Sequence, residues 1–181
     1  MKKTILKFGA YAGLFEFICF VLTWLYIYLF KPDFGVQGYI GYVSILSPLI
    51  FIYFGIRYYR DRYNNGSITF LTAIKIGLLM TIIPALCYAL VETVYVIIID
   101  PKFYENVYMQ DMAQYKKTLS PAAYAVKLKE VKQELVLDKN PFFNFSMMVL
   151  IIAAYGILVT LISSLLLLRK AKKETLNAAG V

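Results

Sequence analysis

Three ionisable side chains, Glu16, Lys75 and Glu92, stand inside long apolar stretches of this sequence. A charged side chain within a bilayer costs at least about 3 kcal/mol, so such residues usually face other protein groups and either pair or take part in transport. The first two lie about eight or nine residues from the start of their stretches, near Lys7 and Ser67, which places both about 12 Å deep. We therefore predict an ion pair between Glu16 and Lys75. The alternatives are a transport or proton site, and independent extension of Lys75 to the lipid headgroups.

Glu92 lies near the opposite end of its apolar stretch. It precedes Asp100 by about eight residues, close enough for its side chain to extend to the membrane interface or to a tyrosine hydroxyl. We expect one of these two environments for the Glu92 carboxyl.

Residues that would support enzymatic or metal chemistry are scarce. The chain contains no His, which removes the commonest general base and metal ligand. Cys19 and Cys87 fall in apolar stretches and form no C-x-x-C or metal spacing, so we expect small hydrophobic thiols and no disulfide. Phosphate-binding, nucleophile-elbow and dinucleotide-binding motifs are missing. The sequence predicts no metal, no cofactor and no enzymatic activity.

The elements that must position these residues are four apolar stretches, at about 8–30, 39–56, 70–99 and 142–168. Each reaches the roughly 17 to 25 residues that cross a bilayer as a helix. With 60% hydrophobic residues and a mean hydropathy of +0.64, the chain leaves too little polar sequence for a separate soluble domain. The first stretch lacks a cleavage site, so we expect it to remain as a span. The predicted fold class is an all-α integral membrane protein, with one membrane domain over residues 1–181.

Positive charge gathers on one side of the predicted spans. Ten basic residues, in the amino terminus, the turn after the second span and the tail from Arg169, stand against only two acids. The other side, which includes residues 101–141, holds nearly equal numbers of Lys and acids. The positive-inside rule places both termini in the cytoplasm and 101–141 outside. We interpret the basic clusters as topology signals that touch anionic lipid at the cytoplasmic face, and not as a nucleic-acid site.

Small residues recur at every fourth position of the third span: Thr69, Ala73, Gly77, Thr81, Ala85, Ala89 and Thr93. Spacing by four keeps them on one ridge of a helix, where another helix can approach closely. Gly156, Thr160 and Ser164 repeat this spacing in the fourth span. We predict that the third helix is central and that its ridge packs within this chain. A homo-oligomer or a membrane-protein partner is the alternative.

Prolines interrupt two of the spans. Pro48 and Pro84 each lack an N–H and leave the carbonyl four residues earlier without its helical bond, so we expect a kink at each. The hydroxyls of Ser44, Ser47 and Thr81 are close enough in sequence to bond the freed groups. Static bends are expected here, with a gating hinge as the alternative.

Residues 101–141 form the only sizeable segment between predicted spans. Apolar residues recur at spacings of three and four over 103–118, which predicts a helix there. Ser120 and Asn140 each precede a proline, a pattern typical of a helix start, so a second helix and the last span should begin at these positions. We predict an extracytoplasmic amphipathic hairpin that caps the bundle. The alternatives are that it lies on the membrane surface or binds a partner.

Two neighbouring runs of residues resemble a known bacterial family. They are Gly55-Ile56-Arg57-Tyr58-Tyr59-Arg60-Asp61 and Gly66-Ser67-Ile68-Thr69-Phe70, followed by Ala73, Lys75 and Gly77. Asp100-Pro101 then opens the polar helical segment, before a last span with a basic end. In this order the chain resembles domain-of-unknown-function family 4199 over nearly its whole length. The resemblance implies a four-span protein of the bacterial inner membrane, and it carries no activity, cofactor or catalytic residue.

Two classes of function fit these features. The small-residue ridge, the hairpin and the missing catalytic motifs favour a non-enzymatic scaffold or accessory subunit. The ionisable residues and prolines within spans favour a small transporter or ion-coupled protein, which would need an oligomer or a very narrow path. A membrane enzyme is the weakest alternative, because the chain has neither His nor a cluster of carboxylates.

Overall fold

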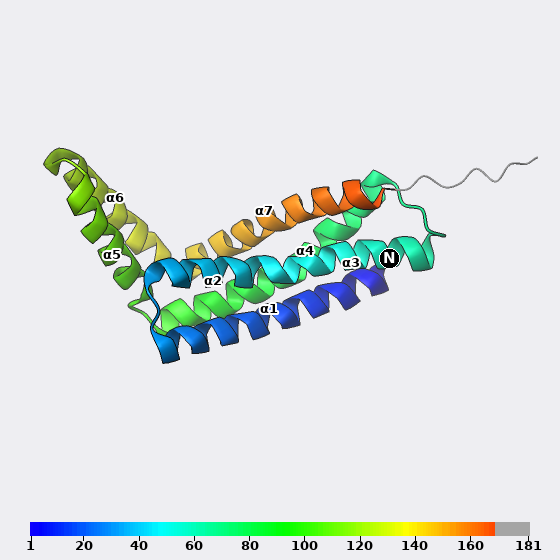
Figure 1. The fold of residues 1–181 in the computed structure, drawn as a ribbon, viewed down its shortest axis with the longest axis horizontal. Helices are drawn as coiled ribbons and strands as arrows, with labels where there is room; N and C mark the ends of the chain where they lie inside the picture. Colours follow the sequence, from blue (N-terminus) through cyan, green and yellow to red (C-terminus); the bar gives the residue numbers. More distant parts are fainter. Residues whose placement is uncertain (169–181) are drawn as a thin grey trace, which may run out of the picture. The chain divides into compact units, whose positions relative to one another are not determined.

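The described part of the chain is built of helices joined by short turns (Figure 1). A computed structural model describes residues 1–168, and among these no strand is present, so the all-α prediction is confirmed. The elements in chain order are α1 (Lys2–Phe30), α2 (Phe34–Leu46), the 3₁₀ turn η1 (Ser47–Leu49), α3 (Ile50–Tyr63), α4 (Phe70–Val94), the π-helical turn η2 (Tyr95–Ile99), α5 (Phe103–Thr118), α6 (Pro121–Asp138) and α7 (Pro141–Leu167).

Four stretches of helix are long and apolar enough to cross a membrane: Lys2–Phe30, Gly35–Tyr63, Phe70–Ile99 and Pro141–Leu167. The four predicted spans are therefore confirmed. The second is longer at both ends than predicted. Asp33 caps a helix that begins at Phe34, and at the other end helical hydrogen bonding continues past the apolar residues into the arginine-rich turn. The basic tail from Arg169, on which the predicted topology partly rests, lies outside the described residues.

Contacts divide the chain into two compact units. The first comprises Met1–Ala85 and Ile152–Val181, of which the structure describes the part up to residue 168, and the second comprises Leu86–Ile151. The first unit therefore holds α1 to α3 with the N-terminal part of α4 and the C-terminal part of α7. The second holds the α5–α6 hairpin with the adjoining ends of α4 and α7.

In the first unit, α1 and α3 lie antiparallel. Ring centroids of Phe8 and Tyr58 are 5.3 Å apart, and those of Phe15 and Phe51 are 5.7 Å apart. A later residue of α1 therefore contacts an earlier residue of α3. Gly55 permits this close approach, because a Cβ there would lie only 3.1 Å from the Cβ of Phe8. A row of aromatic rings therefore fixes α1 against α3.

Glycine and threonine side chains interlock α4 with α7. A Cβ on Gly77 would lie 2.5 Å from the methyl carbon of Thr160, and a Cβ on Gly156 would collide with Thr81. These two pairs run in opposite directions along the helices, so α4 and α7 are antiparallel. The middle five ridge residues, Ala73, Gly77, Thr81, Ala85 and Ala89, are buried. Thr69 at one end of the ridge is exposed, and Thr93 at the other is half-buried. At Gly77 and Thr81, the ridge packs against a helix of this same chain.

Pro48 and Pro84 have different consequences for their helices. Pro48 lies in η1, which separates α2 from α3, and the Ser47 hydroxyl donates to the freed carbonyl of Ser44 at 3.5 Å, as expected. Pro84 lies inside the continuous helix α4. The Thr81 hydroxyl donates at 3.0 Å to the carbonyl four residues before it, and not to the one that Pro84 frees. The backbone is therefore interrupted at Pro48, whereas α4 continues through Pro84.

In the second unit, α5 and α6 lie side by side and antiparallel (Figure 1). The Ser120 hydroxyl accepts a hydrogen bond from the Ala123 N–H at 3.3 Å, so the predicted N-cap is present. Asn140 Oδ1 accepts from the N–H groups of Phe142 and the residue after it, at 3.0 and 3.1 Å. The predicted helix over 103–118 and both predicted helix starts are confirmed, because caps of this kind depend only on neighbouring residues.

Candidate functional site

A chain of four polar side chains joins three helices of the second unit. The Thr93 hydroxyl donates to Asn144 Oδ1, and Asn144 Nδ2 donates to the Tyr104 hydroxyl, both at 2.8 Å. Tyr104 in turn donates to Glu92 Oε1 at 2.8 Å. Every bond therefore points toward Glu92, an arrangement that suits a carboxylate as the final acceptor.

Short connections place these residues together. Glu92 and Thr93 are neighbours in the last turn of α4, Tyr104 is in the first turn of α5, and Asn144 is in the first turn of α7. Only η2 and a short loop separate α4 from α5, so the start of α5 returns to the end of α4. Glu92 and Asn144 are 7% and 1% exposed. A buried carboxylate and a buried amide thus obtain from other side chains the hydrogen bonds that water does not supply.

Tyr104 is the member of this hydrogen-bond network that α5 supplies. Burial raises the pKa of its hydroxyl well above the usual range, and the Glu92 carboxylate raises it further. Tyr104 therefore remains a hydrogen-bond donor at any ordinary pH. Of the two environments expected for Glu92, the structure has the tyrosine hydroxyl. The second oxygen of Glu92, Oε2, is buried and has no hydrogen-bond partner in the described part of the chain.

The start of α5 is also tied to the end of α6. The Tyr108 hydroxyl donates to Asp138 Oδ2 at 2.5 Å. Lys139 forms an ion pair with Glu105 and holds the pKa of the Glu105 carboxyl below its usual range. Both contacts join residues about 30 positions apart in sequence. They close the base of the hairpin.

Glu16, the second buried carboxylate, lies in the first unit. It is 1% exposed, and neither of its carboxylate oxygens has a hydrogen-bond partner within residues 1–168. Three small residues share its buried face of α1: Gly9, Ala12 and Gly13. Cys19, one turn farther along α1, places its Sγ 3.8 Å from Ser47 Oγ of η1. Glu16 is therefore close to the level at which η1 interrupts the second span.

The predicted ion pair between Glu16 and Lys75 is wrong. Lys75 is exposed, whereas Glu16 is buried and its carboxylate has no hydrogen-bond partner among residues 1–168. Gly9 of α1 approaches Ile83, so this level of α1 matches a position eight residues beyond Lys75 in α4. Helix α1 and the first part of α4 run in the same direction (Figure 1). Glu16 follows Gly9 by seven residues, whereas Lys75 precedes Ile83 by eight. At about 1.5 Å per residue, Glu16 and Lys75 are therefore separated by about 22 Å along the helices.

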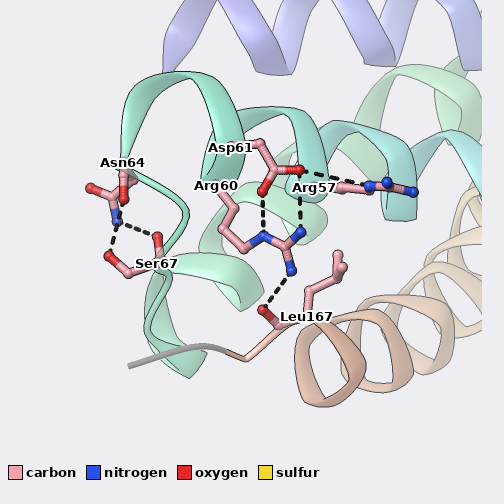
Figure 2. Close-up of polar contacts among 6 residues, drawn as sticks. All are labelled: Arg57, Arg60, Asp61, Asn64, Ser67 and Leu167. Carbon is pink, nitrogen blue, oxygen red and sulfur yellow. Dashed lines mark hydrogen bonds and ion pairs between the residues drawn. The ribbon is translucent and has the colours of Figure 1, made fainter. Parts of the chain in front are cut away.

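A charged cluster closes the end of the first unit at which α3 ends (Figure 2). Arg60 donates to both carboxylate oxygens of Asp61, at 2.6 and 3.2 Å, and its Nη1 donates to the carbonyl of Leu167 at 3.4 Å. Leu167 is the last residue of α7, so the guanidinium satisfies a carbonyl that the helix end leaves free. Arg57 Nε lies 3.7 Å from Asp61 Oδ2. Arg60 thus holds the ends of α3 and α7 together.

The chain reverses between α3 and α4 in a tight turn. Asn65 and Gly66 have φ values of 49° and 74°, in the left-handed region that Asn and Gly tolerate best. Asn64 Nδ2 donates to the Ser67 carbonyl at 2.7 Å, and the Ser67 hydroxyl donates to the Asn64 carbonyl at 3.0 Å (Figure 2). Much of the sequence that carries the family resemblance therefore builds this corner and its charged cluster.

Sequence reasoning expected a tyrosine hydroxyl near Glu92 without naming Tyr104, and it missed two further polar centres, Asn144 and Arg60. Asn144 had a signal, because an amide in an apolar span usually bonds to another helix. Arg60 was interpreted only as a topology charge, and its bond to Leu167 could not be found without the tertiary structure. Within residues 1–168, no group of three or more His, Cys, Asp or Glu side chains is placed to hold a metal ion.

Comparison with known proteins matches residues 7–169 to the model of DUF4199, a family described as proteins of unknown function. The chain belongs to this family. The DUF4199 match includes Glu16, Glu92 and the Arg60 cluster, so each lies in the part that the family model covers. Neither the curated proteins nor the solved structures give a match to the chain.

Proposed function

We propose that this DUF4199 protein is a non-enzymatic accessory subunit or scaffold of the bacterial inner membrane. In this proposal both termini lie in the cytoplasm and the α5–α6 hairpin lies outside. The observation that carries it is the fastening of the hairpin, since Tyr104 bonds to Glu92 and the pair of Glu105 and Lys139 closes its base. A segment held in this way is suited to present a fixed surface.

The surface of the hairpin supports the same proposal. A groove of about 420 Å³ runs between α5 and α6, and it is lined mainly by apolar side chains that include Met109, Met112 and Leu128. Met109 is 63% exposed. Methionine adapts to irregular apolar surfaces, which suits contact with another protein. We propose a membrane protein as the partner and no enzymatic role for this groove.

The topology is tested by single cysteines in a chain whose Cys19 and Cys87 are replaced by Ala. Cysteines at Gln110 and Gln133, both exposed, should react with an impermeant thiol reagent in intact spheroplasts. A cysteine at Asn177 should react only after lysis. Labelling of Asn177 and protection of the two hairpin positions would overturn the topology.

The partner is tested by purification in mild detergent followed by native mass determination. We expect a complex whose mass exceeds that of this chain and its lipids. Met109→Asp, in the groove, should release the second protein, whereas Gln110→Asp, one residue away and outside the groove, should not. A homo-oligomer, or equal behaviour of the two variants, would contradict the accessory-subunit proposal.

A second candidate function rests on Glu16. Within residues 1–168 its carboxyl is buried without a hydrogen-bond partner, near the level of an interrupted helix, and such a group is typical of ion-coupled transporters. In that case Glu16→Gln should abolish a cation-driven flux in vesicles made with the purified protein, while the fold and the mass of the complex stay unchanged. Absence of any cation-dependent flux in the unsubstituted protein would exclude this candidate.

A further inference from the structure

An open groove of about 450 Å³ lies on the first unit along α1 and α3. Its lining combines aromatic and charged side chains: Phe8, Phe51, Phe54, Arg57, Asp61 and Arg62. Along α3 the order is Phe51, Phe54, Arg57, so the groove is apolar toward the middle of the spanning helix and charged toward its end. Phe54 is 43% exposed, which leaves the apolar part accessible.

The charged end of the groove carries more cations than anions. The Asp61 carboxylate accepts both hydrogen bonds of the Arg60 fork and also lies 3.7 Å from Arg57 Nε, so its single negative charge faces two cations. The Arg57 side chain is 55% exposed, and Arg62 is exposed as well. Lys7 Nζ lies 5.3 Å from the centre of a tyrosine ring that also lines the groove. This end therefore carries four cations and one anion, a net excess of three positive charges.

We propose that this groove is a binding site for one anionic phospholipid. Its phosphate lies among Arg57, Arg62 and Lys7, and one acyl chain follows the rings of Phe51 and Phe54. An anionic headgroup fits the excess of arginine and lysine, and arginine is well matched to phosphate oxygens. The order of charged and apolar side chains along α3 is the order of headgroup and chain in a lipid. Free phosphate would use only the charged end.

The inference rests on the proposed function only in that the protein is embedded in a membrane. Lipid binding is measured on the purified full-length chain, without any partner, so its failure is separate from failure of the accessory-subunit proposal. The topology proposal further places this end of α3 in the cytoplasmic leaflet, where anionic lipid attracts basic residues.

The test compares lipids added to the delipidated protein in a neutral detergent. Native mass spectrometry should detect one tightly bound phosphatidylglycerol, and its addition should raise the thermal midpoint more than an equal amount of phosphatidylcholine. Replacing Arg57 and Arg62 by Gln should weaken phosphatidylglycerol binding by about 25-fold, or about fivefold for each cation. Phe54→Ser should weaken binding of long-chain but not of short-chain phosphatidylglycerol.

A matched control removes two lysines of the second unit that are not among the residues that line the groove. Lys116→Gln with Lys117→Gln lowers the net charge by the same amount on the exposed end of α5 and should leave the affinity unchanged. Equal effects of the two double variants would overturn the site. So would equal binding of the two lipids, or displacement of phosphatidylglycerol by inorganic phosphate at equal concentration.

Discussion

Glu92 and Glu16 are two carboxylates in apolar helices, buried to nearly the same extent, with opposite surroundings. Glu92 is 7% exposed and accepts a hydrogen bond from Tyr104, which accepts one from Asn144. Asn144 in turn accepts a hydrogen bond from Thr93. Glu16 is 1% exposed, and its two oxygens have no hydrogen-bond partner in the described structure. Burial alone therefore does not decide whether an acid in a spanning helix is satisfied.

Position along the helix explains the difference. Glu92 lies in the last turn of α4, next to the polar segment that supplies Tyr104. Glu16 lies in the middle of α1, on a face shared with glycine and alanine, which have no side-chain donors. An acid near a helix end can be satisfied by the segment that follows. An acid at mid-helix needs a donor from another span, or a ligand.

The largest expected loss of stability comes from removing the hydrogen-bond donor of Glu92, which leaves its carboxylate without this partner. Tyr104→Phe removes the hydroxyl that bonds to Glu92 and leaves the amide of Asn144 without an acceptor. A buried carboxylate that loses its partner costs about 3 kcal/mol or more. We expect faster hydrogen exchange throughout α5 and α6 and earlier cleavage of 101–141 by trypsin. Tyr124→Phe, on α6, is the control, and equal exchange in both variants would show that the bond contributes nothing.

Replacing the two acids by leucine should change the stability of the protein in opposite directions. Glu16→Leu removes a buried polar group that has no hydrogen-bond partner in the described part of the chain, so the protein should become more stable by about 2 kcal/mol. Glu92→Leu leaves the Tyr104 hydroxyl without an acceptor and should destabilise by about 2 kcal/mol. Thermal melting in detergent, followed by circular dichroism, measures both. If the two variants shift the midpoint in the same direction, the contrast between the sites is wrong.

A smaller effect is expected at the far end of the polar chain. Thr93→Val keeps the shape of the side chain but removes the donor to Asn144 Oδ1, at a cost of about 1 kcal/mol. Because Tyr104 still bonds to Glu92, the hairpin should stay closed. Combined with Tyr104→Phe, the loss should be less than additive, since both act on one network. Strictly additive losses of stability would mean that the hydrogen bonds of this network are independent of one another.

The smallest effect concerns an exposed carboxylate. Lys139 holds the pKa of Glu105 below its usual range, so the pair adds stability above the usual glutamate pKa of about 4.3 and loses it as the pH falls through the lowered value. The difference in melting midpoint between the natural chain and Glu105→Gln should shrink between pH 6 and pH 3. High salt should also shrink it. A constant difference would contradict this.

Local signals predicted the hairpin closely, and long-range signals did not. The helix bounds over 103–118 and the cap at Ser120 depend on residues a few positions apart, and both are confirmed. The prediction that Glu16 pairs with Lys75 required the register between α1 and α4. It assumed that two residues at equal depth from the ends of their spans lie side by side. The sequence already held a warning, because Lys75 is two residues from Ala73 and from Gly77 and so points away from the ridge.

The interlock of α4 and α7 constrains how these helices can move. Gly77 faces Thr160, and Thr81 faces Gly156. A slide by one turn in either direction would bring Thr81 against Thr160 or against Ile152, where no glycine leaves room. Neither helix can therefore ratchet along the other in the first unit without first separating from it. Any working motion in the first unit must therefore move these parts of α4 and α7 together as one rigid body.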